Sequence, residues 1–192
     1  AVESAEVNVG LAFSNIGTKI SYSESATNKD FLPMNMGLGT SFKVDFDGYN
    51  TLMFAADINK LMVPTPDTLD EDANGVLDYK EESVIGGLFK SFGDAPGGAK
   101  EELRELMYSV GLEYWYNKQF AVRAGYFNEH STKGNRKFFT VGLGVKYKVF
   151  GLDFSYLVPT SNQRNPLDNT LRFTLMFDFT GLQEPAPAGD EG

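Results

Sequence analysis

The sequence predicts an all-β protein whose antiparallel strands form part of a transmembrane barrel. Three observations favour this class. Apolar and polar residues alternate over eight segments, the connections between them alternate between short and long, and aromatic residues gather near both ends of the segments. No apolar run approaches the ~18–20 residues that a membrane helix needs. The length of 192 residues suits one domain.

The alternation is clearest over residues 138–148. There Phe139 and Leu143 fall on one face, while Gly142 and Gly144 fall on the other. A soluble β-sandwich or lipocalin-like barrel would also alternate. However, glycine weakens an exposed strand, so glycines on the polar face favour a crowded lumen. The predicted strands are 5–14, 34–46, 49–61, 106–117, 118–130, 138–148, 151–159 and 171–179.

The connections predict an orientation in the outer membrane of a bacterium. Tight turns are expected at 45–49, 117–118 and 149–151, and longer connections at about 15–33, 62–105, 130–136 and 159–168. Bacterial barrels have short periplasmic turns and longer extracellular loops. We therefore assign 1–180 to the barrel, with 62–105 as an extracellular loop, and expect 181–192 to be a disordered tail. Because the chain begins inside a strand pattern, we expect earlier strands to precede it.

Aromatic and charged residues fit the same scheme. Barrels carry an aromatic girdle at each membrane interface. The short-turn end has Phe46, Tyr49, Tyr114, Trp115, Tyr116, Phe120, Tyr147 and Phe150; the other end has Tyr108, Tyr126, Phe127, Phe138, Phe139 and Tyr156. The predicted luminal charges either pair with each other or line a polar passage. They are Asp57, Arg123, Asp153, Arg172 and Asp178, and Lys146 is expected to face the lumen as well.

The long loop contains a calcium-loop motif. Residues 70–81 match D-x-[DN]-x-[DN]-G-x5-E at every position. Ca²⁺ prefers six to eight oxygen ligands. The alternative is an ordinary acidic Asn-Gly turn, and the preceding Val63-Pro64-Thr65-Pro66 cannot form the entering helix of an EF-hand. The candidate ligands are Asp70, Asp72, Asn74, the Val76 carbonyl, Asp78 and Glu81.

A partly helical apolar stripe follows in residues 84–98. Exposed apolar patches usually mark a binding surface, so a partner is one explanation; the other is that the segment folds inward and plugs the barrel. The residues of this stripe are Val84, Ile85, Leu88, Phe89 and Phe92.

Composition argues against several other functions. A net charge of −9 is unsuited to nucleic acid, which requires a positive surface. No cysteine is present, so disulfides and thiolate metal sites are excluded. His130 is the only histidine and falls at a strand end, where we expect a solvated loop residue. No nucleophile with an adjacent base is evident, so we expect no enzymatic activity.

Several segments, in the same order along the chain, resemble the PorV (LptO) family. They are Asn15-Ile16-Gly17-Thr18-Lys19-Ile20-Ser21-Tyr22, Leu61-Met62-Val63-Pro64-Thr65-Pro66, Ser91-Phe92-Gly93-Asp94-Ala95-Pro96-Gly97-Gly98, Glu113-Tyr114-Trp115-Tyr116-Asn117, Arg123-Ala124-Gly125-Tyr126-Phe127-Asn128 and Tyr156-Leu157-Val158-Pro159-Thr160. The resemblance runs from about residue 7 to 179.

The resemblance implies a fourteen-stranded barrel similar to FadL-type fatty-acid transporters, of which this chain would supply the eight C-terminal strands. It also implies a non-enzymatic carrier of the type IX secretion system of the Bacteroidota. Such a carrier receives cargo from the outer-membrane translocon through the cargo's C-terminal signal domain. It then delivers the cargo to an attachment complex that contains a sortase-like peptidase. The competing functions are a FadL-type transporter of hydrophobic small molecules and an enzyme acting on outer-membrane lipid.

Overall fold

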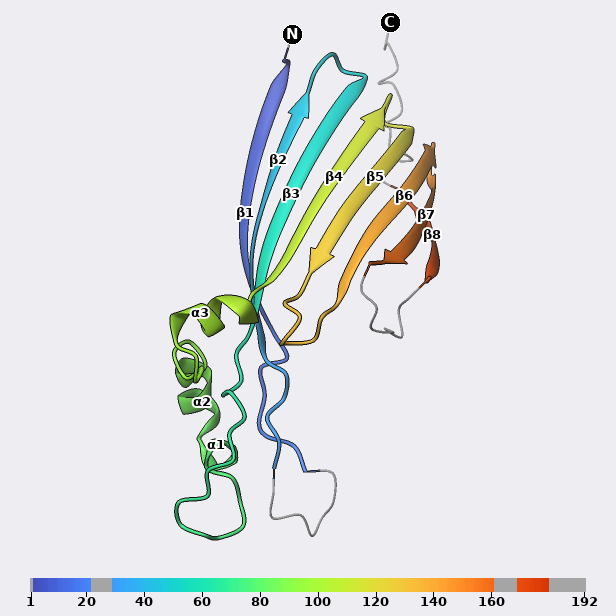
Figure 1. Ribbon diagram of the computed structural model, residues 1–192. Coiled ribbons are helices and arrows are strands. Elements are labelled where there is room, and N and C mark those ends of the chain that lie inside the picture. Colours follow the sequence, from blue (N-terminus) through green and yellow to red (C-terminus); the bar gives the residue numbers. More distant parts are fainter. Residues whose placement is uncertain (1, 22–28, 161–168, 180–192) are drawn as a thin grey trace, which may run out of the picture.

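The computed structural model describes residues 2–21, 29–160 and 169–179. Within them lies one antiparallel sheet of eight strands in chain order, β1 to β8 (Figure 1). The strands are β1 Ser4–Ser14, β2 Asn35–Asp45, β3 Asn50–Leu61, β4 Met107–Tyr116, β5 Phe120–Asn128, β6 Lys137–Tyr147, β7 Phe150–Pro159 and β8 Leu171–Phe177. All eight predicted strands are confirmed, with ends that differ by one or two residues. The predicted tail at 181–192 lies outside the described residues.

The order of connections is also as predicted. The short turns lie at the same end of the sheet as the N-terminus, and the β3–β4 connection projects from the other end (Figure 1). Asp47 shapes the β2–β3 turn: its Oδ1 accepts hydrogen bonds from the backbone nitrogens of Tyr49 at 3.1 Å and Asn50 at 2.7 Å. Gly48 supplies the positive φ of +68° that this tight turn requires.

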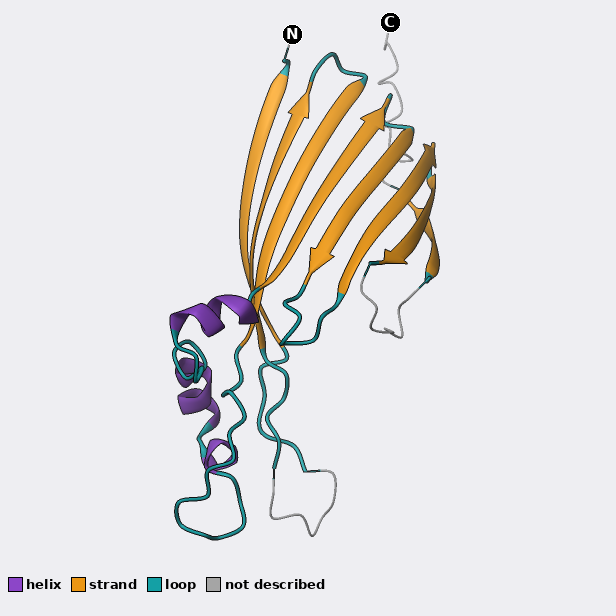
Figure 2. Cartoon of the chain, in the orientation of Figure 1, coloured by secondary structure: helices purple, strands orange, loops and turns teal. Residues whose placement is uncertain are grey.

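One face of the sheet is apolar and uncovered. Leu143 is 55% exposed and Phe173 is 67% exposed, in agreement with their predicted outward positions. The described helices lie at the long-connection end, and none of them covers the sheet (Figure 2). In a soluble sandwich the apolar faces would instead pack against a second sheet. No helix in the described segments is long and apolar enough to cross a membrane.

The opposite face is polar and hollowed. Arg123 lies between two carboxylates: its Nε is 2.5 Å from Glu113 Oε2 and its Nη1 is 2.6 Å from Asp153 Oδ1. We call these three residues the inner-face triad. Arg123 reaches from β5 across β6 to Asp153 on β7, because Gly142 and Gly144 leave room on β6. Of the predicted luminal charges, Arg123 and Asp153 therefore pair, which is one of the two arrangements the sequence allowed.

Aromatic residues near the strand ends occupy both faces. Tyr126 and Phe139 pair with ring centroids 4.8 Å apart, and Phe139 is exposed on the apolar face. Phe127 and Phe138 stack at 4.8 Å and line the hollow of the polar face. The Trp115 ring centroid lies 5.3 Å from the guanidinium carbon of Arg123, so Trp115 is on the same polar face, which we also call the inner face. Proximity to a strand end therefore does not by itself place an aromatic residue on the apolar face.

The long β3–β4 connection contains the helices. They are α1 Asp78–Glu81, α2 Val84–Lys90, α3 Ala99–Glu102 and the 3₁₀ turn η1 Leu103–Glu105. Ser83 caps α2, because its Oγ accepts a hydrogen bond from the Gly86 nitrogen at 2.9 Å. A small core forms here around the buried residues Met34, Met62 and Pro64. Gly87 packs so closely on this core that an added Cβ would lie 2.8 Å from Pro64.

Candidate functional site

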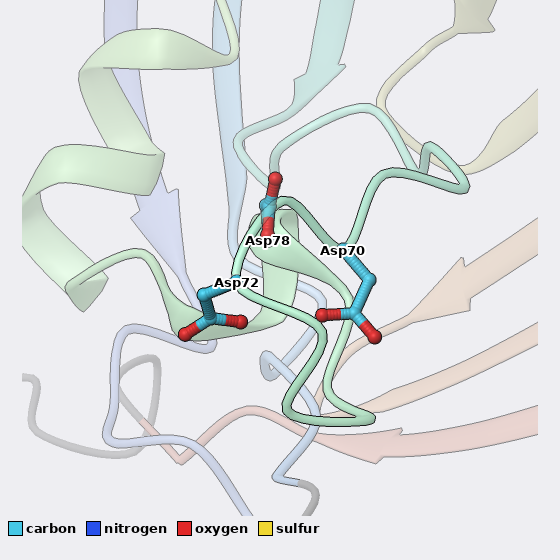
Figure 3. Close-up of side chains that lie close together, drawn as sticks. All are labelled: Asp70, Asp72 and Asp78. Carbon is cyan, nitrogen blue, oxygen red and sulfur yellow. The ribbon is translucent and has the colours of Figure 1, made fainter.

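The predicted calcium-loop residues are brought together in a tight turn at the distal end of the β3–β4 connection. Carboxylate oxygens of Asp70, Asp72 and Asp78 all lie within 4.8 Å of one another (Figure 3). Gly75 has a φ of +84°, which allows the sharp turn expected at this position of the motif. As expected from the prolines before it, no helix enters the turn; α1 begins at Asp78.

Backbone N–H groups and the Asn74 side-chain amide donate hydrogen bonds to the carboxylates of this turn. Asp70 accepts hydrogen bonds from the backbone nitrogens of Asn74 at 3.0 Å and Gly75 at 3.1 Å. The Asn74 amide nitrogen donates to Asp72 at 2.8 Å and to Glu81 at 2.9 Å. Glu81 is thus already directed into the turn. Rotation of the Asn74 amide would present its oxygen in place of its nitrogen, and five side chains would then offer oxygen ligands.

The turn continues directly into contacts with the β1–β2 connection. Lys80 Nζ is 2.8 Å from Asp30 Oδ1, and Lys19 Nζ donates to the Lys80 carbonyl at 2.5 Å. The hydrogen bond to Asp30 raises the pKa of Lys80, so the lysine stays charged near neutral pH. These contacts tie α1 to a connection that lies some fifty residues earlier in the chain.

The residues of the predicted apolar stripe lie on α2, except for Phe92, which lies two residues after the helix ends. Ile85 is 72% exposed, Phe89 is 71% exposed and Phe92 is 45% exposed. Ile85 and Phe89 are four residues apart, so they share one helix face. Val84 and Leu88 are half-buried. The helix lies beyond the end of the strands and not across the polar face of the sheet (Figure 1).

Sequence reasoning missed a cluster of charged residues at the base of this connection. Lys60 Nζ is 3.0 Å from Glu102 Oε2 and 2.7 Å from Glu105 Oε2. Lys133 Nζ is 2.9 Å from both Glu101 Oε1 and Glu105 Oε1. The partners are separated by 28 to 45 residues in the chain. The only sequence signal was the run of glutamates at 101–105, which gives no indication of its partners.

His130 is confirmed as a loop residue. Its Nδ1 lies 2.9 Å from the Thr132 hydroxyl within the β5–β6 connection. In the described part of the chain, His130 is not among the groups that could hold a metal ion.

Comparison with known proteins supports the resemblance noted in the sequence. Residues 4–68 match the family model described as type IX secretion system protein PorV. This match covers β1 to β3 and the start of the long connection. No curated protein matches the chain. The match over residues 4–68, together with an all-β sheet of the expected strand order, supports the similarity of this chain to the PorV family of type IX secretion system proteins.

Proposed function

We propose that this chain is part of an outer-membrane carrier of the type IX secretion system. The carrier receives cargo from the translocon through the cargo's C-terminal signal domain and delivers it to the sortase-like attachment complex at the cell surface. The observation that carries the proposal is the PorV match over residues 4–68. That family is described as a protein of the type IX secretion system, and the proposed role is non-enzymatic.

The chemistry of the two sheet faces supports an outer-membrane location. Among the residues that the structure describes, none covers the apolar face, as a lipid-facing surface requires, while the other face is polar and charged. The sheet is open at β1 and β8 within the described residues, and a barrel must close so that no edge meets lipid. Further strands, up to the proposed fourteen, would complete that closure.

The exposed face of α2 is the proposed contact for secretion partners. Ile85 and Phe89 are exposed on α2, and this helix lies at the long-connection end, beyond the end of the strands (Figure 1). An apolar helix face can bind in a groove of a partner protein. The other residues of the stripe are Val84 and Leu88, which are half-buried in α2, and Phe92, which follows the helix.

Co-purification from native outer membrane tests both the secretion role and the α2 contact. The tagged full-length chain should bring down translocon chains or cargo signal domains. Ile85→Ser with Phe89→Ser should lower that capture at least tenfold, because it removes the apolar anchors. Leu103→Ser is the matched control, since Leu103 is 62% exposed in the same connection but lies outside α2.

Two outcomes would contradict different parts of the proposal. If the unaltered chain captures no secretion component, the carrier role is wrong. If both variants capture equally, the role stands but α2 is not the contact.

A transporter of hydrophobic small molecules is the alternative function. The inner-face triad argues against it, because an apolar ligand moving along this face would meet a charged group with two carboxylates for one guanidinium. Loss of long-chain fatty-acid uptake on deletion of the gene, with secretion intact, would favour the transporter.

We also propose that residues 70–81 bind Ca²⁺ at the cell surface. The turn places oxygens of Asp70, Asp72 and Asp78 near one another and directs Glu81 inward. A bound cation would relieve the repulsion between these neighbouring carboxylates. Extracellular calcium modules work with dissociation constants of about 10⁻⁴–10⁻³ M, so the missing entering helix need not prevent binding.

A further inference from the structure

The charged cluster at the base of the β3–β4 connection joins three separate parts of the fold. Lys60 is the penultimate residue of β3, Lys133 lies in the β5–β6 connection, and Glu101, Glu102 and Glu105 lie on α3 and η1. We propose that these five side chains form a latch that fixes the long connection against the rim of the sheet and so holds α2 in one position relative to the strands.

Lys60 is the inner half of the latch. Its side chain is only 5% exposed, and both of its carboxylate partners are 15% exposed. A buried ammonium is stable only when it is paired, so the position of Lys60 requires Glu102 and Glu105 to remain close. The glutamates therefore hold α3 and η1 against the end of β3.

Lys133 is the outer half of the latch. It contacts Glu101 and Glu105 at 2.9 Å each, with its side chain 22% exposed. Glu105 thus bridges the two lysines. Burial alone would raise the pKa of Glu105, but its hydrogen bonds with Lys60 and Lys133 outweigh that effect and lower the pKa below its usual value. Glu105 is therefore ionised at neutral pH, as the latch requires.

Hydrogen bonds at both ends of the segment that contains α2 connect it to the latch. Asp94 accepts hydrogen bonds from the Thr65 backbone nitrogen and the Thr65 hydroxyl, both at 2.9 Å. Glu102 also accepts a hydrogen bond from the Ala95 nitrogen at 2.9 Å. The two ends of segment 65–94 are thus joined to each other and to the latch. As a result, the ion pairs of the latch restrain the position of α2 relative to the strands.

Hydrogen exchange of the full-length chain in detergent micelles tests the latch without any secretion partner. Lys133→Met removes the ammonium group that pairs with both Glu101 and Glu105. We expect amides in both 99–105 and 84–90 to exchange at least tenfold faster, while the strands keep their rates. Lys133→Arg should retain protection, since arginine can pair with both carboxylates.

Lys100→Met is the matched control. Lys100 is exposed on α3 and forms no ion pair among residues 2–21, 29–160 and 169–179. The latch is overturned if Lys133→Met exchanges no faster than this control. Faster exchange only at 99–105 would overturn its role in positioning α2. Lys60→Met should have a larger effect because that lysine is buried; if it prevents folding, the Lys133 variants still decide the outcome.

Discussion

Arginine in place of Leu143 tests whether the apolar face of the sheet meets lipid. Leu143 is 55% exposed and lies one residue from the centre of β6, which spans Lys137–Tyr147. With a rise of ~3.3 Å per residue and a strand tilt of ~40°, Leu143 would lie about 2.5 Å from the bilayer midplane. A charge at that depth costs roughly 2–4 kcal/mol, so the folded-to-unfolded ratio should fall ~30- to 700-fold.

Two control variants separate membrane depth from the general effect of adding arginine. Tyr147 is 62% exposed on the same face, but five residues from the strand centre, or about 12–13 Å along the membrane normal. That distance is the edge of the ≈ 25 Å apolar band, so Tyr147→Arg should cost only ~0–1 kcal/mol. Ser109→Arg, on the polar face beside Asp57, should also cost little.

Denaturant unfolding in phospholipid vesicles measures these costs. Trp115 is the only tryptophan of the sequence and lies on the inner face beneath Arg123, so its fluorescence reports unfolding without contact with the substituted side chains. The reasoning is refuted if Leu143→Arg costs no more than Tyr147→Arg. It is also refuted if Ser109→Arg is as destabilising as Leu143→Arg, because the two faces would then be equivalent.

Three further predictions concern the turn at residues 70–81, the space that Gly144 leaves on β6, and the latch. Glu81→Gln should weaken Ca²⁺ binding roughly tenfold or more in a calorimetric titration, while Glu71→Gln, at a non-ligand position, should not; equal affinities would mean the motif match is accidental. Gly144→Val should destabilise the chain by about 1–3 kcal/mol in the same vesicle assay, because an added Cβ would lie 2.6 Å from the Asp153 carboxylate. Gly10→Val is the control, because no atom of the described residues lies within 4 Å of a Cβ added there; equal costs would mean that the space at Gly144 is not needed. Because the folded-state pKa of Glu105 is lowered, its stabilising contribution is present above the unfolded value of about 4.3 and is lost as pH falls through the folded pKa. The amide hydrogen-exchange rates of residues 99–105, corrected for intrinsic rates, should therefore be the same at pH 7 and pH 5. They should rise only in stronger acid.

The strands could be predicted because their signal is local. Side chains two residues apart lie on one face of a strand, so the alternation around Leu143 fixes both the secondary structure and the face. The turn at 70–81 was recognisable for a similar reason, since its candidate ligands all fall within one short segment and Gly75 marks the sharp bend. The sequence alone thus determined eight strands, their order of short and long connections, and the candidate ligand set.

Contacts between distant residues were decided by the tertiary structure. Arg123 has possible partners throughout the chain, and only the register of β4 to β7 brings Glu113 and Asp153 to its two sides. Lys60 and Lys133 are far apart in sequence and meet Glu105 only because the long connection folds back onto the rim. Alternation assigns each residue of a strand to a face, but charge pairing depends on distances across strands and loops. Those distances exist only after the chain has folded.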